Sequence, residues 1–209
     1  GDIATGGQGN DTFDVTQSGT IAAVSAITIN DIGLGDTLLI VESESAAAPR
    51  VNTDGVLSFN GGSQQVTLTG WDSSWSLKQL ATGQYTVVKV PNQTVVIQSM
   101  SKDSGQNDDW ITANGNENRL ISGSISAGLN TSEVVEISFD NGASWASATT
   151  SGTGWSVIDP QQHDVTWTMQ GRVRNTAEDV FDATKVASQT VYFDATHPNK
   201  LALGLVSDT

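Results

Sequence analysis

The fold of this chain is decided by the stretch DVTWTMQGRVRN, residues 164–175. Its apolar residues Val165, Trp167, Met169 and Val173 stand at alternate positions, with polar or charged residues between most of them. Successive side chains of a β-strand point to opposite faces, so this two-residue period indicates a strand with one buried face. The stretch therefore predicts a half-buried strand in a sheet.

The sequence on either side of this stretch repeats the pattern, and helical periodicity is nearly absent. An alternating apolar run at residues 135–139 is followed by Asn141-Gly142, a pair that favours a hairpin turn because both residues tolerate positive φ. Residues 108–198 hold roughly seven such runs, spaced about eight to twelve residues apart, as expected for an Ig-like two-sheet sandwich. Three tryptophans are available to fill its core: Trp145, Trp155 and Trp167.

Residues 1–100 are also rich in predicted strands, but they do not clearly follow the same fold. Short runs of Val, Ile, Thr and Tyr alternate with turns rich in Gly, Ser and Asn. The runs fall at residues 27–29, 38–41, 56–59, 66–68, 85–90 and 94–97. The polar segment 101–107 is the predicted boundary between two regions. We therefore predict an all-β chain with domains at residues 1–100 and 101–198.

The last residues of the sequence resemble an earlier segment. LVSDT at residues 205–209 is similar to MSKDS at residues 100–104, about 105 residues upstream, and similarity at a fixed period indicates tandem domains. Residues 199–209 are therefore predicted to be a linker and the first strand of a further Ig-like domain. Such arrays carry load or display more often than chemistry, and we expect a monomer whose partners are neighbouring domains of the same polypeptide.

The chain is strongly acidic, with a net charge of −14 over 209 residues. It should repel nucleic acid and anionic membranes, so neither is an expected partner. Many acids stand in Gly-, Asn- and Asp-rich turns, where their oxygens suit a hard cation such as Ca²⁺; solubility alone is the alternative. The absence of cysteine excludes disulfides and thiolate sites. No apolar run is long enough to span a membrane, and we recognise no signal peptide.

A glycine-rich loop near the start carries the sharpest local motif. Residues 6–13, GGQGNDTF, place Asp11 after glycines that permit a tight turn, and another aspartate stands nine residues before Asp11. This pattern resembles the nonapeptide calcium-binding repeat of the RTX family. The resemblance implies Asp11 as a Ca²⁺ ligand, and it implies Asp31 and Asp36 in the segment 27–38. One repeat cannot bury a core alone, and an ordinary hairpin loop is the alternative reading.

The second region resembles the bacterial Ig-like domains of giant type I-secreted adhesins. The resemblance covers almost all of residues 101–209 and rests on segments at residues 103–112, 137–145, 152–155 and 191–198. It implies an extracellular, non-catalytic extender domain whose junctions are stiffened by Ca²⁺.

By position, the same resemblance implies Ca²⁺ ligands at both junctions of this domain. They are Asp103, Asp108 and Asp109 at the first junction and Asp194 and Asp208 at the second. The chain departs from the family at residues 175–179, where NTAED replaces an Asp-Ala-Ala-Gly-Asn turn. Asp179 is the acid that could compensate for this change.

Motifs for catalysis are absent, and one aromatic pair remains as a binding candidate. The sequence holds no nucleophile elbow, phosphate loop or HExxH pair, and its two histidines, His163 and His197, are predicted to lie in surface turns. Trp71 and Trp75 stand four residues apart in a polar loop, where they could stack on a sugar ring or pack into the core.

These observations predict a non-enzymatic, Ca²⁺-stiffened structural segment of a large extracellular bacterial adhesin, exported to the cell surface by type I secretion. The alternative is a module in which Trp71 and Trp75 bind a host or biofilm glycan or another surface polymer. A non-catalytic region of a secreted hydrolase is a third hypothesis.

Overall fold

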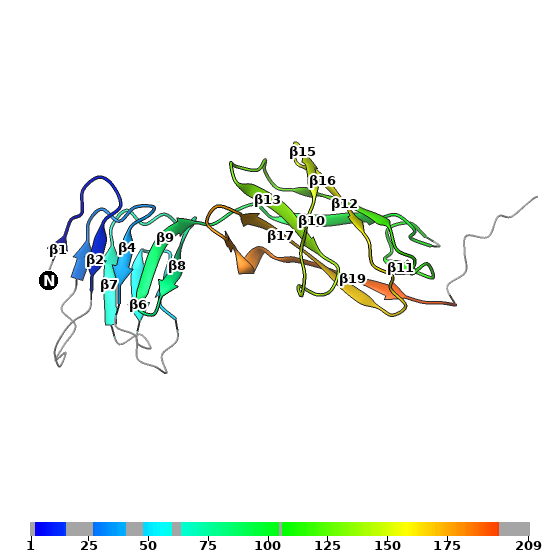
Figure 1. The fold of residues 1–209 in the computed structure, drawn as a ribbon, viewed down its shortest axis with the longest axis horizontal. Helices are drawn as coiled ribbons and strands as arrows, with labels where there is room; N and C mark the ends of the chain where they lie inside the picture. Colours follow the sequence, from blue (N-terminus) through cyan, green and yellow to red (C-terminus); the bar gives the residue numbers. More distant parts are fainter. Residues whose placement is uncertain (1–2, 16–26, 41–47, 60–63, 105, 197–209) are drawn as a thin grey trace, which may run out of the picture. The chain divides into compact units, whose positions relative to one another are not determined.

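The computed structural model describes residues 3–15, 27–40, 48–59, 64–104 and 106–196 (Figure 1). Almost all regular structure in these ranges is β-strand, and the helical part is one 3₁₀ turn, Ala183–Lys185. The predicted all-β fold class is therefore confirmed. The chain divides into two compact units, Gly1–Val90 and Pro91–Thr209.

The first unit consists of two sheets. One has the order β1-β3-β7-β6-β5, and the other has the order β2-β4-β9-β8. The strands of the first sheet are β1 (Ile3–Ala4), β3 (Ile27–Ile29), β7 (Gln64–Leu68), β6 (Val56–Phe59) and β5 (Arg50–Val51). Those of the second are β2 (Thr12–Asp14), β4 (Thr37–Leu39), β9 (Gln84–Lys89) and β8 (Trp75–Ala81).

The chain begins this unit as a parallel coil that alternates between the two sheets. β1 pairs in parallel with β3, and β2 pairs in parallel with β4. Partners lie 25 positions apart in both sheets, as Ala4 with Ile29 and Phe13 with Leu38 show. β7 continues the parallel direction beside β3, whereas β9 runs antiparallel to β4. Two turns of coil are thus closed by antiparallel strands.

The core of the first unit lies between these sheets, because alternate residues of each strand point inward. Ile29, Leu57 and Leu68 come from one sheet and Leu38 and Val87 from the other, and each is at most 2% exposed. Both sheets end in edge strands: β1 and β2 at one end of the unit, and β5 and β8 at the other. Among the described residues, the core is therefore least covered at these two ends.

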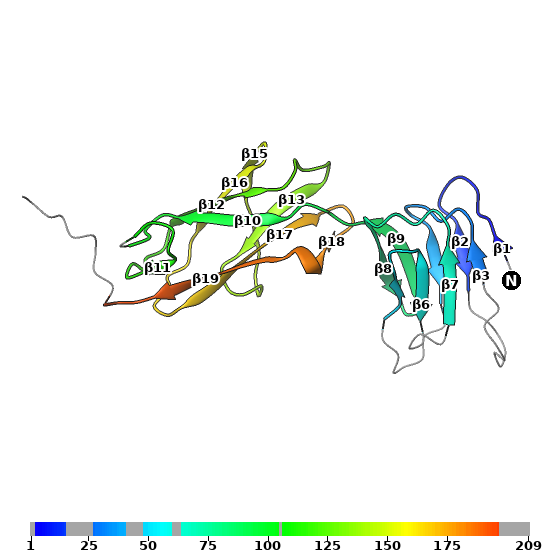
Figure 2. The ribbon, with the colours of Figure 1, turned by 180° about the vertical axis from the view of Figure 1, so that it is seen from behind.

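The second unit is a sandwich-like pair of sheets, seen from both sides in Figures 1 and 2. One sheet has the order β10-β12-β16-β15 and the other β11-β19-β17-β13-β14, with β18 beside β17. The first contains β10 (Val95–Met100), β12 (Arg119–Ile125), β16 (Gly154–Asp159) and β15 (Thr149–Ser151). The second contains β11 (Ile111–Thr112), β19 (Ala187–Phe193), β17 (Trp167–Asn175), β13 (Glu133–Ser138), β14 (Ala146–Ser147) and β18 (Val180–Phe181).

The strand predicted at residues 164–175 forms β17. Along this strand, buried residues alternate with partly exposed ones, as the apolar pattern predicted. Trp167, Met169 and Val173 are buried and pack with Ile121 of the facing sheet. The prediction that Val165 lies on the buried face of this strand is wrong. The strand begins two residues later, and the Val165 side chain is 66% exposed.

Two of the three predicted core tryptophans lie in the core of the second unit. Trp155 and Trp167 are buried, whereas Trp145 is only partly buried and stacks on the Arg172 guanidinium, 3.9 Å from its ring centre. The assignment of Trp145 to the core is therefore corrected: its indole N–H donates to the carbonyl of Gly142 in the hairpin turn, which holds the ring outside.

The division between the units falls earlier than predicted. The sequence placed the boundary after residue 100, but β10 pairs with β12, so Val95–Met100 belongs to the second unit. The chain passes from one unit to the other at Val90-Pro91. Residues 101–107 follow β10 and lie inside the second unit.

Candidate functional site

Asp31 joins the two turns of the coil through its carboxylate. The backbone N–H groups of Gly6 and Gly7 donate to its two oxygens at 2.9 and 2.6 Å. These hydrogen bonds hold the pKa of the Asp31 carboxyl below its usual range, because they favour the charged form. Gly6 lies one coil turn, 25 residues, before Asp31, so the bond is a contact between successive turns.

Asp36 makes the same kind of connection in the interior. It is 1% exposed, and its oxygens accept the N–H of Asp11 at 2.9 Å and the N–H of Gly33 at 2.7 Å. Asp11 is the residue one turn earlier, and its carbonyl accepts the N–H of Thr37 at 2.8 Å. The turn loops are therefore stacked by reciprocal bonds that involve a buried carboxylate.

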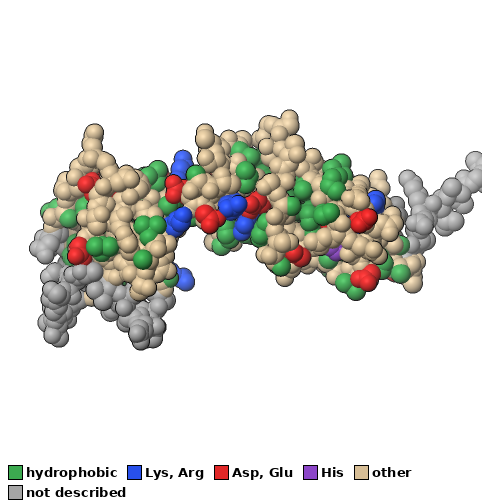
Figure 3. Space-filling view, viewed as in Figure 1, with side chains coloured by type: hydrophobic (Ala, Val, Ile, Leu, Met, Phe, Trp, Pro, Cys, Tyr) green, Lys and Arg blue, Asp and Glu red, His purple; other side chains and the backbone are tan. Residues whose placement is uncertain are grey.

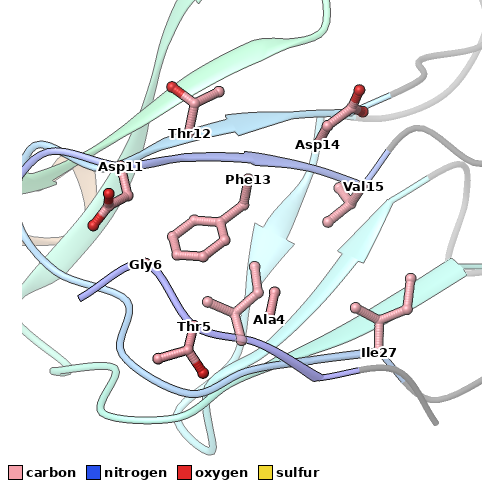
Figure 4. A pocket seen from close by; sticks show the side chains of 10 residues that line it. Ala4, Thr5, Gly6, Asp11, Thr12, Phe13, Asp14, Val15 and Ile27 are labelled. Carbon is pink, nitrogen blue, oxygen red and sulfur yellow. The ribbon is translucent and has the colours of Figure 1, made fainter.

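Asp11 is one of the residues that line a recess at the β1–β2 end of the unit (Figure 4). Its carboxylate packs over Gly6, where an added Cβ would come within 2.5 Å of Asp11 Oδ2. The side chain of Phe13 points into the recess beside Ala4 and Ile27 (Figure 4). Glycine at position 6 thus makes room for the acid of the loop motif.

The structure does not gather the three predicted ligands of the coil, Asp11, Asp31 and Asp36, into one cluster. Asp31 and Asp36 already bind backbone N–H groups with both oxygens. Within the described ranges, no three His, Cys, Asp or Glu side chains come close enough to hold a metal ion together. The geometry of Asp31 and Asp36 fits hydrogen bonding between turns, and their role as Ca²⁺ ligands stays a prediction.

The loop that follows β10 has a different character, because one of its carboxylate oxygens is unpaired. Asp103 Oδ2 accepts the N–H of Asp108 at 2.7 Å, while Oδ1 is buried without a hydrogen-bond partner. Burial raises the pKa of the Asp103 carboxyl and the nearby charges of Asp109 and Asp108 add to this, while the backbone N–H groups of Asp108 and Trp110 partly oppose it. The loop is sharply folded, with positive φ at Lys102, Asp108 and Trp110. The loop therefore keeps the Asp103 carboxylate buried near like charges, which disfavours its ionised form.

Asp194 lies at the same end of the second unit as this loop. Thr112 links them: its hydroxyl donates to the Lys102 carbonyl at 2.8 Å, and its own carbonyl accepts the Asp194 N–H at 2.9 Å. The Asp194 carboxylate accepts both the N–H and the hydroxyl of Thr196. The predicted second-junction residue Asp208 lies outside the described residues.

This placement differs from the predicted division of acids between two junctions. Asp103, Asp108 and Asp109 were assigned to the junction with the preceding domain. β10 begins near that junction and spans about 17 Å before its loop, so the three acids lie at the opposite end of the sandwich, beside Asp194. A cation held there would act beside Asp194, near the last of the described residues.

Asp179 is occupied by an ion pair. Arg174 Nη1 donates to Asp179 Oδ1 at 2.7 Å, and Arg174 Nε donates to Glu136 at 2.9 Å. Arg172 also pairs with Glu136, at 2.8 Å. Figure 3 shows Lys and Arg side chains next to Asp and Glu on the face in view. Asp179 thus has a cation partner from its own unit, so its assignment as a compensating Ca²⁺ ligand remains only a prediction.

Trp71 and Trp75 come together at the β5–β8 end of the first unit. Their ring centres are 5.8 Å apart with the planes at 81°, and both pack partly against the core. They line a recess of about 260 Å³ together with Pro49, Arg50, Val51, Ser76 and Leu77. Both predicted roles are compatible with this position, since each indole covers the core and is partly exposed. Trp75 begins strand β8, although the sequence placed it in a loop.

Sequence reasoning missed a buried charged network in the second unit. Arg119 and Asp159 have no exposed surface and pair at 2.8 Å. His163 Nε2 lies 3.0 Å from the same carboxylate, and its ring stacks on Trp167 at 4.1 Å. The Arg119 guanidinium lies over Trp167 as well. The sequence could have indicated that Arg119 is buried, because it stands at the same alternate positions as the buried residues of β12.

His163 is therefore not the surface histidine that the sequence predicted. It is 8% exposed, and its backbone N–H donates to the carbonyl of Gly115. A Cβ at position 115 would come within 1.7 Å of the His163 carbonyl oxygen, so glycine permits this contact. The close approach of these backbones buries the ring. His197 lies outside the described residues.

Acidification should destabilise the second unit through His163. Burial lowers the pKa of its imidazole, and Asp159 only partly opposes this. A folded-state pKa below the unfolded one means that stability is complete above about pH 6.5 and falls as the pH drops toward the folded pKa, by at most about 1.4 kcal/mol per pH unit. Denaturant titrations from about pH 7.5 to about pH 5 should show this slope, and His163→Gln should flatten it. An equal slope in both proteins would contradict the assignment.

Comparisons with known proteins found no counterpart: no family model and no curated protein matches the chain. Among the described residues, no helix has the length and apolar character needed to cross a bilayer.

Proposed function

We propose that this chain is a structural segment of a large extracellular bacterial adhesin, and that it is stiffened by Ca²⁺ at the exit end of the second unit. The proposal is supported by the acidic composition, by the two compact β-units, and by the resemblance of residues 101–209 to adhesin Ig-like domains. Export by type I secretion belongs to the same proposal, since an acidic chain that depends on Ca²⁺ would be less rigid before it reaches the outside.

The unpaired Asp103 Oδ1 is the observation that carries the calcium proposal. A buried carboxylate oxygen without a donor is costly, and a divalent cation would supply the missing partner. The carboxylates of Asp103, Asp108 and Asp109 do not stand as a ready-made cluster, so a bound ion would have to draw them together, with carbonyls and water completing the shell that Ca²⁺ prefers. Because Thr112 connects this loop to Asp194, the bound ion would tie the loop to the segment through which the chain continues.

Calcium should stabilise the second unit only while Asp103 is present. At about ten times its dissociation constant, Ca²⁺ should add about 1.4 kcal/mol and raise the Tm of this unit by about 5–10 °C. Asp103→Asn should remove that shift. In chelator, the same variant should match or exceed the original Tm, because it lacks a carboxylate whose raised pKa disfavours the charged form. Differential scanning calorimetry in Ca²⁺ and in chelator measures all four values.

The matched control is Asp164→Asn, which removes the same charge from an exposed position of the unit. It should keep the calcium shift. If Ca²⁺ does not raise the Tm of the unchanged chain, or if it raises the Tm of Asp103→Asn equally, the Asp103 loop is not the site.

Carbohydrate recognition by the first unit is a second candidate function. It is favoured by one observation: the two indoles named by the sequence line a single recess and meet edge to face. Recesses in which aromatic side chains stand beside a few polar groups are a common form of small-ligand sites. The ligand class that this recess suits is derived below.

A further inference from the structure

We propose that the β5–β8 recess binds a pyranose ring that carries a carboxylate, with Trp71 and Trp75 holding the ring and Arg50 pairing with the acid. This inference rests on the second candidate function, carbohydrate recognition. It adds the chemical class of the ligand and a third residue that the sequence did not single out.

The two indoles form a corner into which a flat, partly apolar ring fits. Because their planes stand at 81°, a ligand ring that stacks flat on one indole turns its own edge toward the other. The face of an aromatic ring is negative and its edge is positive. The C–H groups on one side of a pyranose carry slight positive charge and pack on the negative indole face. Val51 and Leu77 extend the apolar wall.

Arg50 supplies the one cationic group in the lining of this recess. It lies on the edge strand β5, opposite Ser58, and its side chain is exposed. All ion pairs found among the described residues lie in the second unit, so none of them uses Arg50. A guanidinium presents parallel N–H donors that match a carboxylate. An available arginine beside two indoles therefore favours an acidic sugar over a neutral one.

The charge of the first unit limits how long this ligand can be. Residues 1–90 contain nine acidic and three basic residues, so a long polyanion would be repelled by the surface around the recess. Repulsion between single charges is screened beyond about 8 Å at physiological salt. The site therefore suits one acidic sugar at the end of a chain, and it does not suit the interior of a polyuronate.

The test compares two ligands that differ only in the acid. Methyl glucuronide and methyl glucoside would be titrated into the full chain by heteronuclear NMR, following the indole N–H signals of Trp71 and Trp75 and the Nε–H signal of Arg50. The glucuronide should bind at least about tenfold more tightly, as one charge-assisted pair provides. Arg50→Gln should bring the two affinities within about twofold of each other. Lys78→Gln removes a cation of β8 that is not part of the recess lining and should leave the preference unchanged.

The possible outcomes separate the two claims. If both sugars bind equally and Trp75→Ala removes the binding, carbohydrate recognition stands and the acid preference is overturned. If neither sugar shifts the indole signals, both are overturned. Tighter binding of polygalacturonate than of the single glucuronide, per sugar, would contradict recognition of a terminal residue. Since Arg50 is exposed on an edge strand, its variant should fold like the original, and circular dichroism checks this.

Discussion

Asp159→Ala should lower the free energy of unfolding of the second unit by about 3–5 kcal/mol, the largest effect expected for a single substitution in this chain. Arg119 has no exposed surface, and within the described part of the chain its one ion pair is with Asp159 at 2.8 Å. Two other guanidinium nitrogens, Nε and Nη2, already lack partners. Removing the carboxylate would leave a buried, uncompensated cation, and it would also free the N–H of Gln161.

Hydrogen exchange of the β12 and β16 amides measures this effect in the second unit alone, because local opening reports the stability of the unit that contains each amide. Asp164→Ala is the control: it lies five residues further along at an exposed position and should change stability by no more than about 0.5 kcal/mol. The double substitution Arg119→Met with Asp159→Leu should recover most of the loss, since an apolar pair of similar size needs no compensation. Equal effects of Asp159→Ala and Asp164→Ala would contradict the argument.

Strands with a clear two-residue period could be predicted from the sequence, and those without one could not. The predicted runs at residues 27–29 and 56–59 coincide with β3 and β6, because β-branched and apolar residues there alternate between core and solvent. β8 was missed: its sequence, WSLKQLA, covers an end of the core, and no residue in it is fully buried. The pairing of β1 with β3 was also beyond the sequence, since strand order depends on contacts between residues 25 apart.

Candidate site residues could be named from the sequence more reliably than their roles. Asp31 and Asp36 stand in the glycine-rich segments as predicted, but their oxygens face backbone donors of the neighbouring turn, which only the register reveals. Asp103 was assigned to the wrong end of the second unit because β10 had been placed in the first. The buried pair of Arg119 and Asp159 was missed because a charged residue is ordinarily assigned to the surface. In each case the missing information was the strand partner.

Asp36→Ala should destabilise the first unit by about 2–4 kcal/mol, the second-largest effect expected. The substitution removes two charge-assisted hydrogen bonds and leaves the N–H groups of Asp11 and Gly33 without acceptors in a site that is 1% exposed. Asp36→Asn keeps one acceptor oxygen and should lose about half as much. The amides of β4 and β9 report the change by hydrogen exchange, and Asp54→Ala, in an exposed turn, is the control.

The dependence of this loss on Ca²⁺ decides what Asp36 does. If the Asp36 carboxylate joins the coil turns by accepting N–H groups, Asp36→Ala should lower the free energy of unfolding equally in Ca²⁺ and in chelator. If the carboxylate acts as a Ca²⁺ ligand, Asp36→Ala should lower the free energy of unfolding only in Ca²⁺, because in chelator the interaction with the ion is already absent. We expect equal losses, since both oxygens already have backbone donors. A loss of stability seen only in Ca²⁺ would instead show that Asp36 binds the metal, as the RTX resemblance implies. The stacking of the coil turns would then depend on the ion.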